Sequence, residues 1–301
     1  MTDADSIMTS RMATIAIVVG VAASVLVATR TIAPTSSPSS AVLFQVLGLG
    51  INVITVSIPG RFDSDVEATS NMAFPWPTLL APAGYAFAIW GVIYVGEVMG
   101  LLVLLFGHKQ VAEVAQRSSR AWLCANIAQS FWCAAFRPWA LSRLWLSSIC
   151  LGATALCLFY SQCELSLDRD KVMAPGFSAG EWALLQWPRS LHLGWTTAAT
   201  LVNLNAWVGK SAAGAPAAMC AAVLSLLLAA RLSELFTSAA IRLPAAALSV
   251  NWALFAIAKG APVGRDAEAL GQPALEGLAS SATAIAMGGL AFLSLRAGGL
   301  L

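Results

Sequence analysis

The sequence predicts an all-α protein embedded in a membrane. Of its 301 residues, 58% are hydrophobic and only 11% are charged, and the mean hydropathy is +0.75. A soluble domain carries about 25% charged residues, so this chain has too few charges to cover a water-soluble globule. The apolar residues gather in successive runs that are each long enough to cross most of a bilayer as a helix. The formal net charge of +2 is small and scattered, which argues against nucleic acid as a partner.

The first forty residues form a segment of their own. Met12 to Thr29 is an apolar run rich in Ala and Val, and a stretch of Pro, Ser and Thr follows it. This pattern fits either a cleaved targeting segment or a retained extra helix. We expect residues 1–40 to be a targeting or anchor segment outside the core fold.

Five apolar spans between residues 41 and 209 form the predicted core. A tight turn at Arg137-Pro138-Trp139 predicts that the third and fourth spans are an antiparallel hairpin. The polar loop from Arg61 to Thr78 contains prolines that exclude a regular helix, and a loop of mixed charge from Glu164 to Pro188 precedes the fifth span. The five spans are Ala41–Pro59, Pro82–Phe106, Ala121–Phe136, Leu141–Gln162 and Leu191–Val208.

Residues 210–301 contain three further apolar spans, which are Ala213–Leu232, Ile241–Ala258 and Leu278–Leu295. The chain is therefore expected to be an integral, multi-pass membrane protein with a five-helix core and about three additional C-terminal transmembrane helices. A bacterial inner membrane and an organelle membrane are both open as its location.

The fifth span carries a regular pattern of aromatic, small and amide side chains. Trp195, Ala199, Asn203 and Trp207 recur at every fourth residue. At roughly 100° per residue they drift by about 120° from first to last, so they share one broad helical face. Lipid offers an amide no hydrogen bond. We interpret this face as the wall of an interior cavity for a flat apolar ligand, with ordinary helix packing as the alternative.

Three of the predicted spans carry motifs with characteristic spacing. In the second span the residues are Pro82, Gly84, Tyr85, Phe87, Trp90 and Tyr94. In the fifth span, whose spacing is the most specific, they are Trp195, Ala199, Thr200, Asn203 and Trp207. The third span contributes Asn126, which Ser130 follows. Over roughly residues 41 to 208, these motifs resemble the TspO/MBR family of tryptophan-rich sensory proteins and translocator proteins.

The resemblance implies a five-helix bundle around a pocket that the loop between the first two core spans covers. It also implies binding of tetrapyrroles such as protoporphyrin and haem, or of sterol-like lipids. Trp90, Trp195 and Trp207 would then stack on the ligand, Ala199 would leave room for it, and Asn203 would supply a polar contact. The complete set of expected ligand-binding residues is Trp90, Tyr94, Glu97, Asn126, Trp132, Trp195, Ala199, Thr200, Asn203 and Trp207.

Three features depart from the family pattern. The segment between Gly84 and Trp90 is one residue shorter than in better-known members, and Ala88 stands near the position of their second proline. Gln129 occupies a position where many members have Trp. Three spans follow the core, so the chain resembles an extended branch. A deletion within a helix would rotate everything beyond it by roughly 100°, whereas one before the helix would leave the pocket intact.

Glu97 is the unusual charge of the second span. It recurs at helical spacing with Trp90, Tyr94 and Leu101, far from either end of an apolar helix. An intramembrane carboxylate is costly and is a functional candidate by default, although a structural hydrogen bond to another helix would also explain it. The pattern Gly96-x-x-x-Gly100 around it permits close approach of a second helix.

His108 and His192 are the only histidines, and the predicted topology puts both at the same membrane surface. Two imidazoles could ligate haem iron or another metal, but we favour interfacial residues without a ligand. No spacing of Cys, His and carboxylates predicts a metal centre. The six cysteines form no C-x-x-C pair and are expected to be small buried hydrophobic residues.

The predicted function is binding of a tetrapyrrole or sterol-like ligand for transport or sensing. Membrane lipids and a small apolar ligand are the expected partners, no cofactor is required, and a homodimer is one open arrangement. A secondary transporter with Glu97 as a proton-coupled site is the first alternative, and a porphyrin-modifying enzyme is the second. The chain has no G-x-S-x-G, Walker A or H-E-x-x-H motif, so we do not expect an enzyme.

Overall fold

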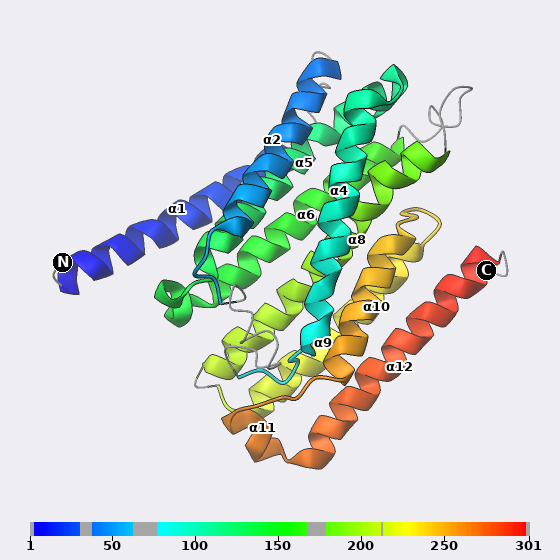
Figure 1. The fold of residues 1–301 in the computed structure, drawn as a ribbon. Coiled ribbons are helices and arrows are strands. Elements are labelled where there is room, and N and C mark those ends of the chain that lie inside the picture. Colours follow the sequence, from blue (N-terminus) through cyan, green and yellow to red (C-terminus); the bar gives the residue numbers. More distant parts are fainter. Residues whose placement is uncertain (1–2, 31–37, 63–76, 168–178, 212, 299–301) are drawn as a thin grey trace. The chain divides into compact units, whose positions relative to one another are not determined.

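The computed structural model describes residues 3–30, 38–62, 77–167, 179–211 and 213–298. Over these residues the regular structure is helical, apart from an isolated β-bridge between Thr78 and Val263 (Figure 1). The all-α prediction is therefore confirmed. The expected pocket cover falls largely on residues 63–76, which lie outside the described residues.

The helices follow the predicted order along the chain. Short 3₁₀ helices, Gly84–Ala88 (η1) and Pro138–Arg143 (η2), precede α4 and α6 respectively. The α-helices are α1 (Asp3–Thr29), α2 (Pro38–Ser57), α4 (Ile89–Phe106), α5 (Lys109–Ala135), α6 (Trp145–Leu167), α8 (Ala179–Lys210), α9 (Ala215–Thr237), α10 (Pro244–Ala258), α11 (Arg265–Leu270) and α12 (Gln272–Ala297).

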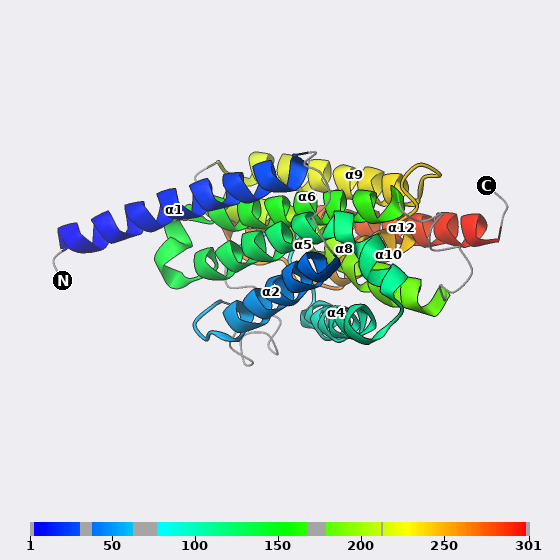
Figure 2. The ribbon, with the colours of Figure 1, turned by 90° about the horizontal axis from the view of Figure 1, so that it is seen from above.

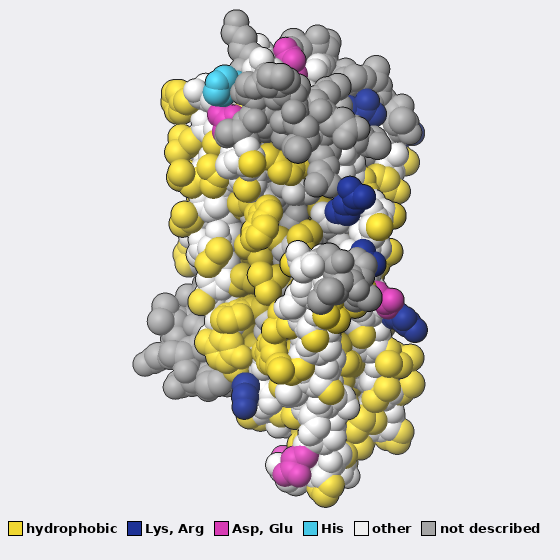
Figure 3. All heavy atoms as spheres, turned by 90° about the vertical axis from the view of Figure 1, so that its right-hand side faces the viewer, with side chains coloured by type: hydrophobic (Ala, Val, Ile, Leu, Met, Phe, Trp, Pro, Cys, Tyr) yellow, Lys and Arg dark blue, Asp and Glu magenta, His cyan; other side chains and the backbone are white. Residues whose placement is uncertain are grey.

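Six helical segments of the described chain are long and apolar enough to cross a membrane, and α10 is a shorter apolar helix. Large hydrophobic side chains on these helices are exposed, for example Val92, Val95 and Phe106 on α4. Hydrophobic atoms cover much of the face shown in Figure 3, with few charged groups between them. Exposed apolar surface of this extent suits a lipid environment, so the chain is an integral multi-pass membrane protein. The six segments are Met8–Thr29, Ser39–Ser57, Gly84–Phe106, Trp145–Ser166, Ala215–Thr237 and Gln272–Ala297.

The chain divides into two compact units. Unit 1 contains residues 1–61 and 91–193, and unit 2 contains residues 62–90 and 194–301. Helices α4 and α8 therefore each contribute residues to both units.

Helix α5 is the centre of unit 1, where it packs against α1, α2 and α6 (Figure 2). The α5–α6 hairpin is confirmed. Beside its turn, Arg137 donates from Nη1 to the carbonyl oxygen of Pro59 at 2.6 Å and from Nη2 to that of Ile58 at 3.2 Å. Helix α1, the segment expected to lie outside the core, contacts α5 and α6, and Arg143 donates a hydrogen bond of 2.5 Å to Ser10 Oγ.

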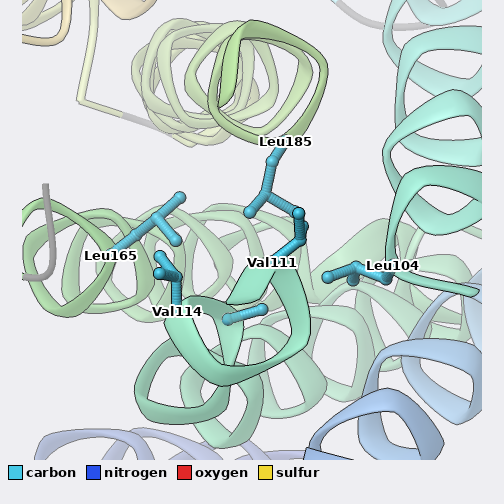
Figure 4. Close-up of a cluster of buried hydrophobic side chains, with 6 residues drawn as sticks. Leu104, Val111, Val114, Leu165 and Leu185 are labelled. Carbon is cyan, nitrogen blue, oxygen red and sulfur yellow. The ribbon is translucent and has the colours of Figure 1, made fainter. Parts of the chain in front are cut away.

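Two helices of unit 1 begin well before their apolar runs. Helix α5 begins at Lys109 rather than Ala121, and α8 begins at Ala179 rather than Leu191. The prediction of a loop from Glu164 to Pro188 is therefore wrong for Ala179–Pro188 and for the end of α6, while residues 168–178 lie outside the described part. The extensions are held by a buried apolar cluster of Leu104, Val111, Val114, Ala115, Leu165 and Leu185, drawn from α4, α5, α6 and α8 (Figure 4).

Unit 2 joins the start of the second span to the C-terminal helices. Helices α9, α10 and α12 pack against one another, and η1 contacts α10. The amide of Ala83 donates to the carbonyl oxygen of Ala256 at 2.9 Å, and Trp252 Nε1 donates to that of Ala86 at 3.1 Å. The additional helices thus pack directly on the segment that carries the second-span motif.

Gly194 permits the close contact of α8 with α10. A Cβ atom there would lie 2.1 Å from the carbonyl oxygen of Ala246, which is backbone and has little room to move.

We expect Gly194→Ala to lower the free energy of unfolding by about 1–3 kcal/mol because of overpacking. Gly277→Ala on α12 is the control, since its Cβ would have nothing within 4 Å and alanine favours a helix by up to about 1 kcal/mol. SDS-induced unfolding in mixed micelles, followed by circular dichroism, measures both, and equal effects would contradict the prediction.

Candidate functional site: a buried charged cluster and an aromatic cluster

Glu97 on α4 and His192 on α8 form a buried pair in unit 1. Glu97 Oε1 lies 2.7 Å from His192 Nδ1, and both side chains are 0% exposed. Removing ionisable groups from water costs several kcal/mol per ion unless they are paired and hydrogen-bonded. The carboxylate singled out in the sequence therefore has a partner on another helix.

Two glycines on α4 allow α8 to approach closely enough for this pair. A Cβ atom at Gly96 would lie 2.6 Å from Pro188 Cγ, and one at Gly100 would lie 2.7 Å from the carbonyl oxygen of Leu184. The helix contact expected from the Gly96-x-x-x-Gly100 pattern is present. Larger residues at either position would separate the two helices that supply Glu97 and His192.

Arg189 and Trp122 complete the charged cluster. The Arg189 guanidinium lies 4.4 Å from the centre of the Trp122 ring, a cation–π contact. The Trp122 ring meets the His192 imidazole edge-on at 6.5 Å, and Arg189 interacts electrostatically with Glu97. Among the described residues, Glu97 Oε2 and Arg189 Nη1 have no hydrogen-bond partner. The cluster therefore retains the capacity to bind a proton or another small polar group.

The two histidines differ, and the interfacial prediction is wrong for His192. His108 Nδ1 contacts Glu181 Oε1 at 3.2 Å, and its side chain is 61% exposed. His192 is fully buried. Because α8 begins at Ala179, His192 lies about 20 Å along the helix from its first residue and not near the helix start. Arg189 lies in the same helix. Neither Arg189 nor Trp122 stood out in the sequence, because their meeting depends on contacts between distant helices.

A closed hydrogen-bond network joins α2, α4 and α5. Asn52 Nδ2 donates to Asn126 Oδ1 at 2.8 Å and to Gln129 Oε1 at 2.9 Å. Gln129 Nε2 donates to the Tyr94 hydroxyl at 3.3 Å, which in turn donates to Asn52 Oδ1 at 3.2 Å. Two expected ligand-binding residues, Tyr94 and Asn126, are thus engaged within the protein. Gln129, the departure from the family's Trp, belongs to the same network, and Asn52 was not foreseen.

Trp132 also contacts other residues of unit 1. Its Nε1 donates to Ser147 Oγ at 2.8 Å, and its ring stacks on Phe136 with the centres 5.0 Å apart. The Arg61 guanidinium lies 5.8 Å from the same ring. This residue therefore ties α5 to α6 at the hairpin.

In unit 2, the motifs of the second and fifth spans meet in an aromatic cluster. Trp195 is buried, and its ring makes edge contacts with Phe87 at 5.8 Å and Trp90 at 6.2 Å between ring centres. The segment between Gly84 and Trp90 contains η1, and α4 begins only at Ile89. Most of this segment therefore precedes the α-helix.

The remaining fifth-span residues have different environments. Asn203 is buried and donates from Nδ2 to the carbonyl oxygen of Ala199 at 2.8 Å, while Thr200 Oγ1 donates to that of Thr196 at 2.7 Å. Trp207 is 41% exposed and lies at the surface. The expected drift of about 120° along the face explains why Trp195 and Trp207 end up in different surroundings.

A small apolar cavity lies on another side of α8 in unit 2. It is lined by Leu80, Ala198, Leu201, Ser225, Leu226, Ala229, Val250, Ala253, Leu254 and Ile257, and its volume is about 10 Å³. That is room for about one water molecule, whereas ligand pockets measure roughly 300–1,000 Å³. A large ligand could enter this cavity only if the surrounding helices moved apart.

Buried polar clusters inside a set of lipid-exposed helices define a multi-pass α-helical membrane protein. A family model described as TSPO-like protein matches residues 39–292. The chain belongs to that family, and the resemblance to the TspO/MBR family is confirmed. No curated protein and no solved structure matches it significantly. The family match begins in α2 and ends in α12, so it includes the C-terminal helices and leaves out most of residues 1–40.

We expect Glu97→Ala to be strongly destabilising, because it leaves the Arg189 guanidinium buried without a compensating charge and removes the hydrogen-bond partner of His192. Breaking a buried pair in this way costs about 3–5 kcal/mol. Glu181→Ala is a matched control, since it removes the same residue type from the more exposed His108–Glu181 pair, and should cost about 1 kcal/mol or less. SDS-induced unfolding of both variants would test this. Equal losses would mean that Glu97 is not the stabilising charge of the cluster.

Proposed function

We propose that this protein binds a planar apolar ligand, either a tetrapyrrole such as protoporphyrin or haem or a sterol-like lipid, for transport or sensing. The observation that carries the proposal is the aromatic cluster of Trp195, Phe87 and Trp90, in which two motif segments far apart in the sequence meet. Family membership supports the same function. On this proposal Ala199, Thr200 and the buried Asn203 border the ligand.

Ligand binding would require a conformational change in the helices. Trp195 is almost completely buried, and the apolar cavity on another side of α8 has room for about one water molecule. A ligand that binds a more open arrangement would shift the population towards that arrangement. Such a shift would give a sensor its signal and would be a necessary step for a transporter. The residues proposed as the TspO-like core are 41–209, with 210–301 as additional helices that support it.

Trp195→Ala should weaken binding of protoporphyrin about ten-fold, since a lost aromatic contact is worth up to about 1.5 kcal/mol beyond the lost area. Binding is followed by the absorbance of the ligand, because tryptophan fluorescence would change with the substitution itself. Trp187→Ala on the same helix is the control, since Trp187 is exposed and should leave affinity unchanged. Unchanged affinity in Trp195→Ala would remove the aromatic cluster from the binding site. New absorption bands on illumination would instead favour a porphyrin-modifying enzyme.

Proton-coupled transport of a small solute is a second candidate. It is favoured by the fully buried Glu97–His192 pair and by the free hydrogen-bonding capacity of Glu97 Oε2. Intramembrane carboxylates and histidines form proton relays in pumps and transporters. Uptake of a proton by Glu97 would weaken its attraction to the Arg189 guanidinium, which would couple protonation to the α4–α8 contact.

Reconstitution into vesicles with an enclosed pH-sensitive dye tests this second function. For a transported solute, we expect an imposed pH gradient to collapse faster with the wild-type protein than with empty vesicles. Glu97→Gln should abolish the solute-dependent collapse, because an amide cannot carry the proton. Glu181→Gln should retain it. Collapse at the wild-type rate in Glu97→Gln would exclude Glu97 as the coupling group.

A further inference from the structure

A surface groove runs between the end of α8 and the start of α9 in unit 2. Its volume is about 440 Å³, and its lining is mostly apolar. Trp207 forms one wall of the groove. Ala217 and Ala221 lie one helical turn apart on α9, and their small side chains leave space for an apolar recess in the groove. The lining residues are Trp207, Val208, Ser211, Ala213, Ala217, Cys220, Ala221 and Leu224. Cys220 is exposed here, so the prediction of a buried cysteine is wrong at this position.

Most of this groove faces hydrocarbon. Helix α9 is one of the segments able to cross a membrane, and the exposed side chains beside the groove, such as Val223, Leu224 and Leu227, are large and apolar. Lipid acyl chains are the molecules that contact such a surface. The groove is thus an apolar recess of a size suited to hydrocarbon.

One end of the groove is polar and positively charged. Trp207 stands one turn before the end of α8 at Lys210, an arrangement typical of the membrane–water interface. Lys210 is exposed and is followed by Ser211, which lines the groove. Arg265, with a side chain that is 66% exposed, donates from Nη2 to the Ser211 carbonyl oxygen at 3.5 Å. Asp266 also contacts Arg265 at 3.0 Å. Lys210 and Arg265 together therefore bring two positive charges to this end of the groove, and Asp266 brings one negative charge.

We propose that the groove binds a phospholipid with an anionic headgroup. One acyl chain lies along α9 in the apolar recess, and the headgroup phosphate lies by Ser211 between Lys210 and Arg265. Basic residues at the membrane surface attract anionic lipids, and the apolar recess holds the chain that a free anion lacks. This site is independent of the proposed ligand-binding function, since Trp207 is about 18 Å along α8 from Trp195.

Cys220 offers a native reporter of occupancy, because it is the exposed cysteine of the described chain and lines the groove. The purified protein in mild detergent is titrated with phosphatidylglycerol, phosphatidylcholine or inorganic phosphate, and the rate of Cys220 alkylation by a maleimide is followed. We expect phosphatidylglycerol to slow alkylation at concentrations at least ten-fold lower than phosphatidylcholine. Inorganic phosphate should have no effect. Native mass spectrometry should show phosphatidylglycerol retained on the protein.

Variants separate the headgroup and chain contributions. The double substitution Lys210→Gln with Arg265→Gln should remove the ten-fold preference, whereas Arg242→Gln, in the loop after the far end of α9, should retain it. Ala221→Phe, which fills the recess, should abolish protection by both lipids. Helical content and unfolding midpoint are measured for each variant, and a variant that fails to fold is replaced by Ala217→Leu or by the single charge substitutions. Equal protection by both lipids, protection by phosphate alone, or a preference unchanged in the double variant would overturn the proposal.

Discussion

Hydrocarbon supplies no hydrogen bonds, so a polar atom between the ends of these helices is costly unless it finds a partner within the chain. Unit 1 shows how far this constraint reaches. Asn52, Tyr94 and Gln129 close a ring of hydrogen bonds between three helices, and the Glu97 carboxylate contacts the His192 imidazole on a fourth. Because apolar side chains can slide past one another in lipid, these polar partners determine which helices meet and in what register.

The need for internal hydrogen bonds also limits the polar groups that a bound ligand could contact. In unit 1, Tyr94 and Asn126 already bond to the protein, and in unit 2 the amide nitrogen of Asn203 bonds to its own helix. Few directional contacts are left beside the aromatic rings of Phe87, Trp90 and Trp195. Recognition on the proposed site would therefore depend on shape and apolar area. Tetrapyrroles and sterols share a flat apolar body, so such a site would discriminate only modestly between them.

Local chemistry in the sequence predicted the spanning helices and several buried positions. Apolar runs indicated the helices, the charge within α4 indicated a buried site at Glu97, and the spacing of the fifth-span motif indicated that Trp195 and Asn203 face the interior. The features that the sequence did not predict depend on contacts between residues far apart in the chain. The early starts of α5 and α8 are stabilised by Leu165 and Leu185 from separate helices, and no local pattern reveals them. The partner of Glu97 lies 95 residues further along the chain, and only the longer α8 brings it into the interior.

Hydrogen bonds and a ring contact connect the start of the second span with helix α10. The second span begins as a 3₁₀ helix at Gly84–Ala88. Helix α10 bonds to this start, since the Ala256 carbonyl accepts from the amide of Ala83 and Trp252 donates to the Ala86 carbonyl. The T-shaped contact of Tyr85 with Trp252 at 5.3 Å lies at the same place. Buried backbone groups left unpaired would cost about 1–3 kcal/mol each. Helix α10 therefore stabilises the start of the second span, and both segments lie within the range that the family model matches.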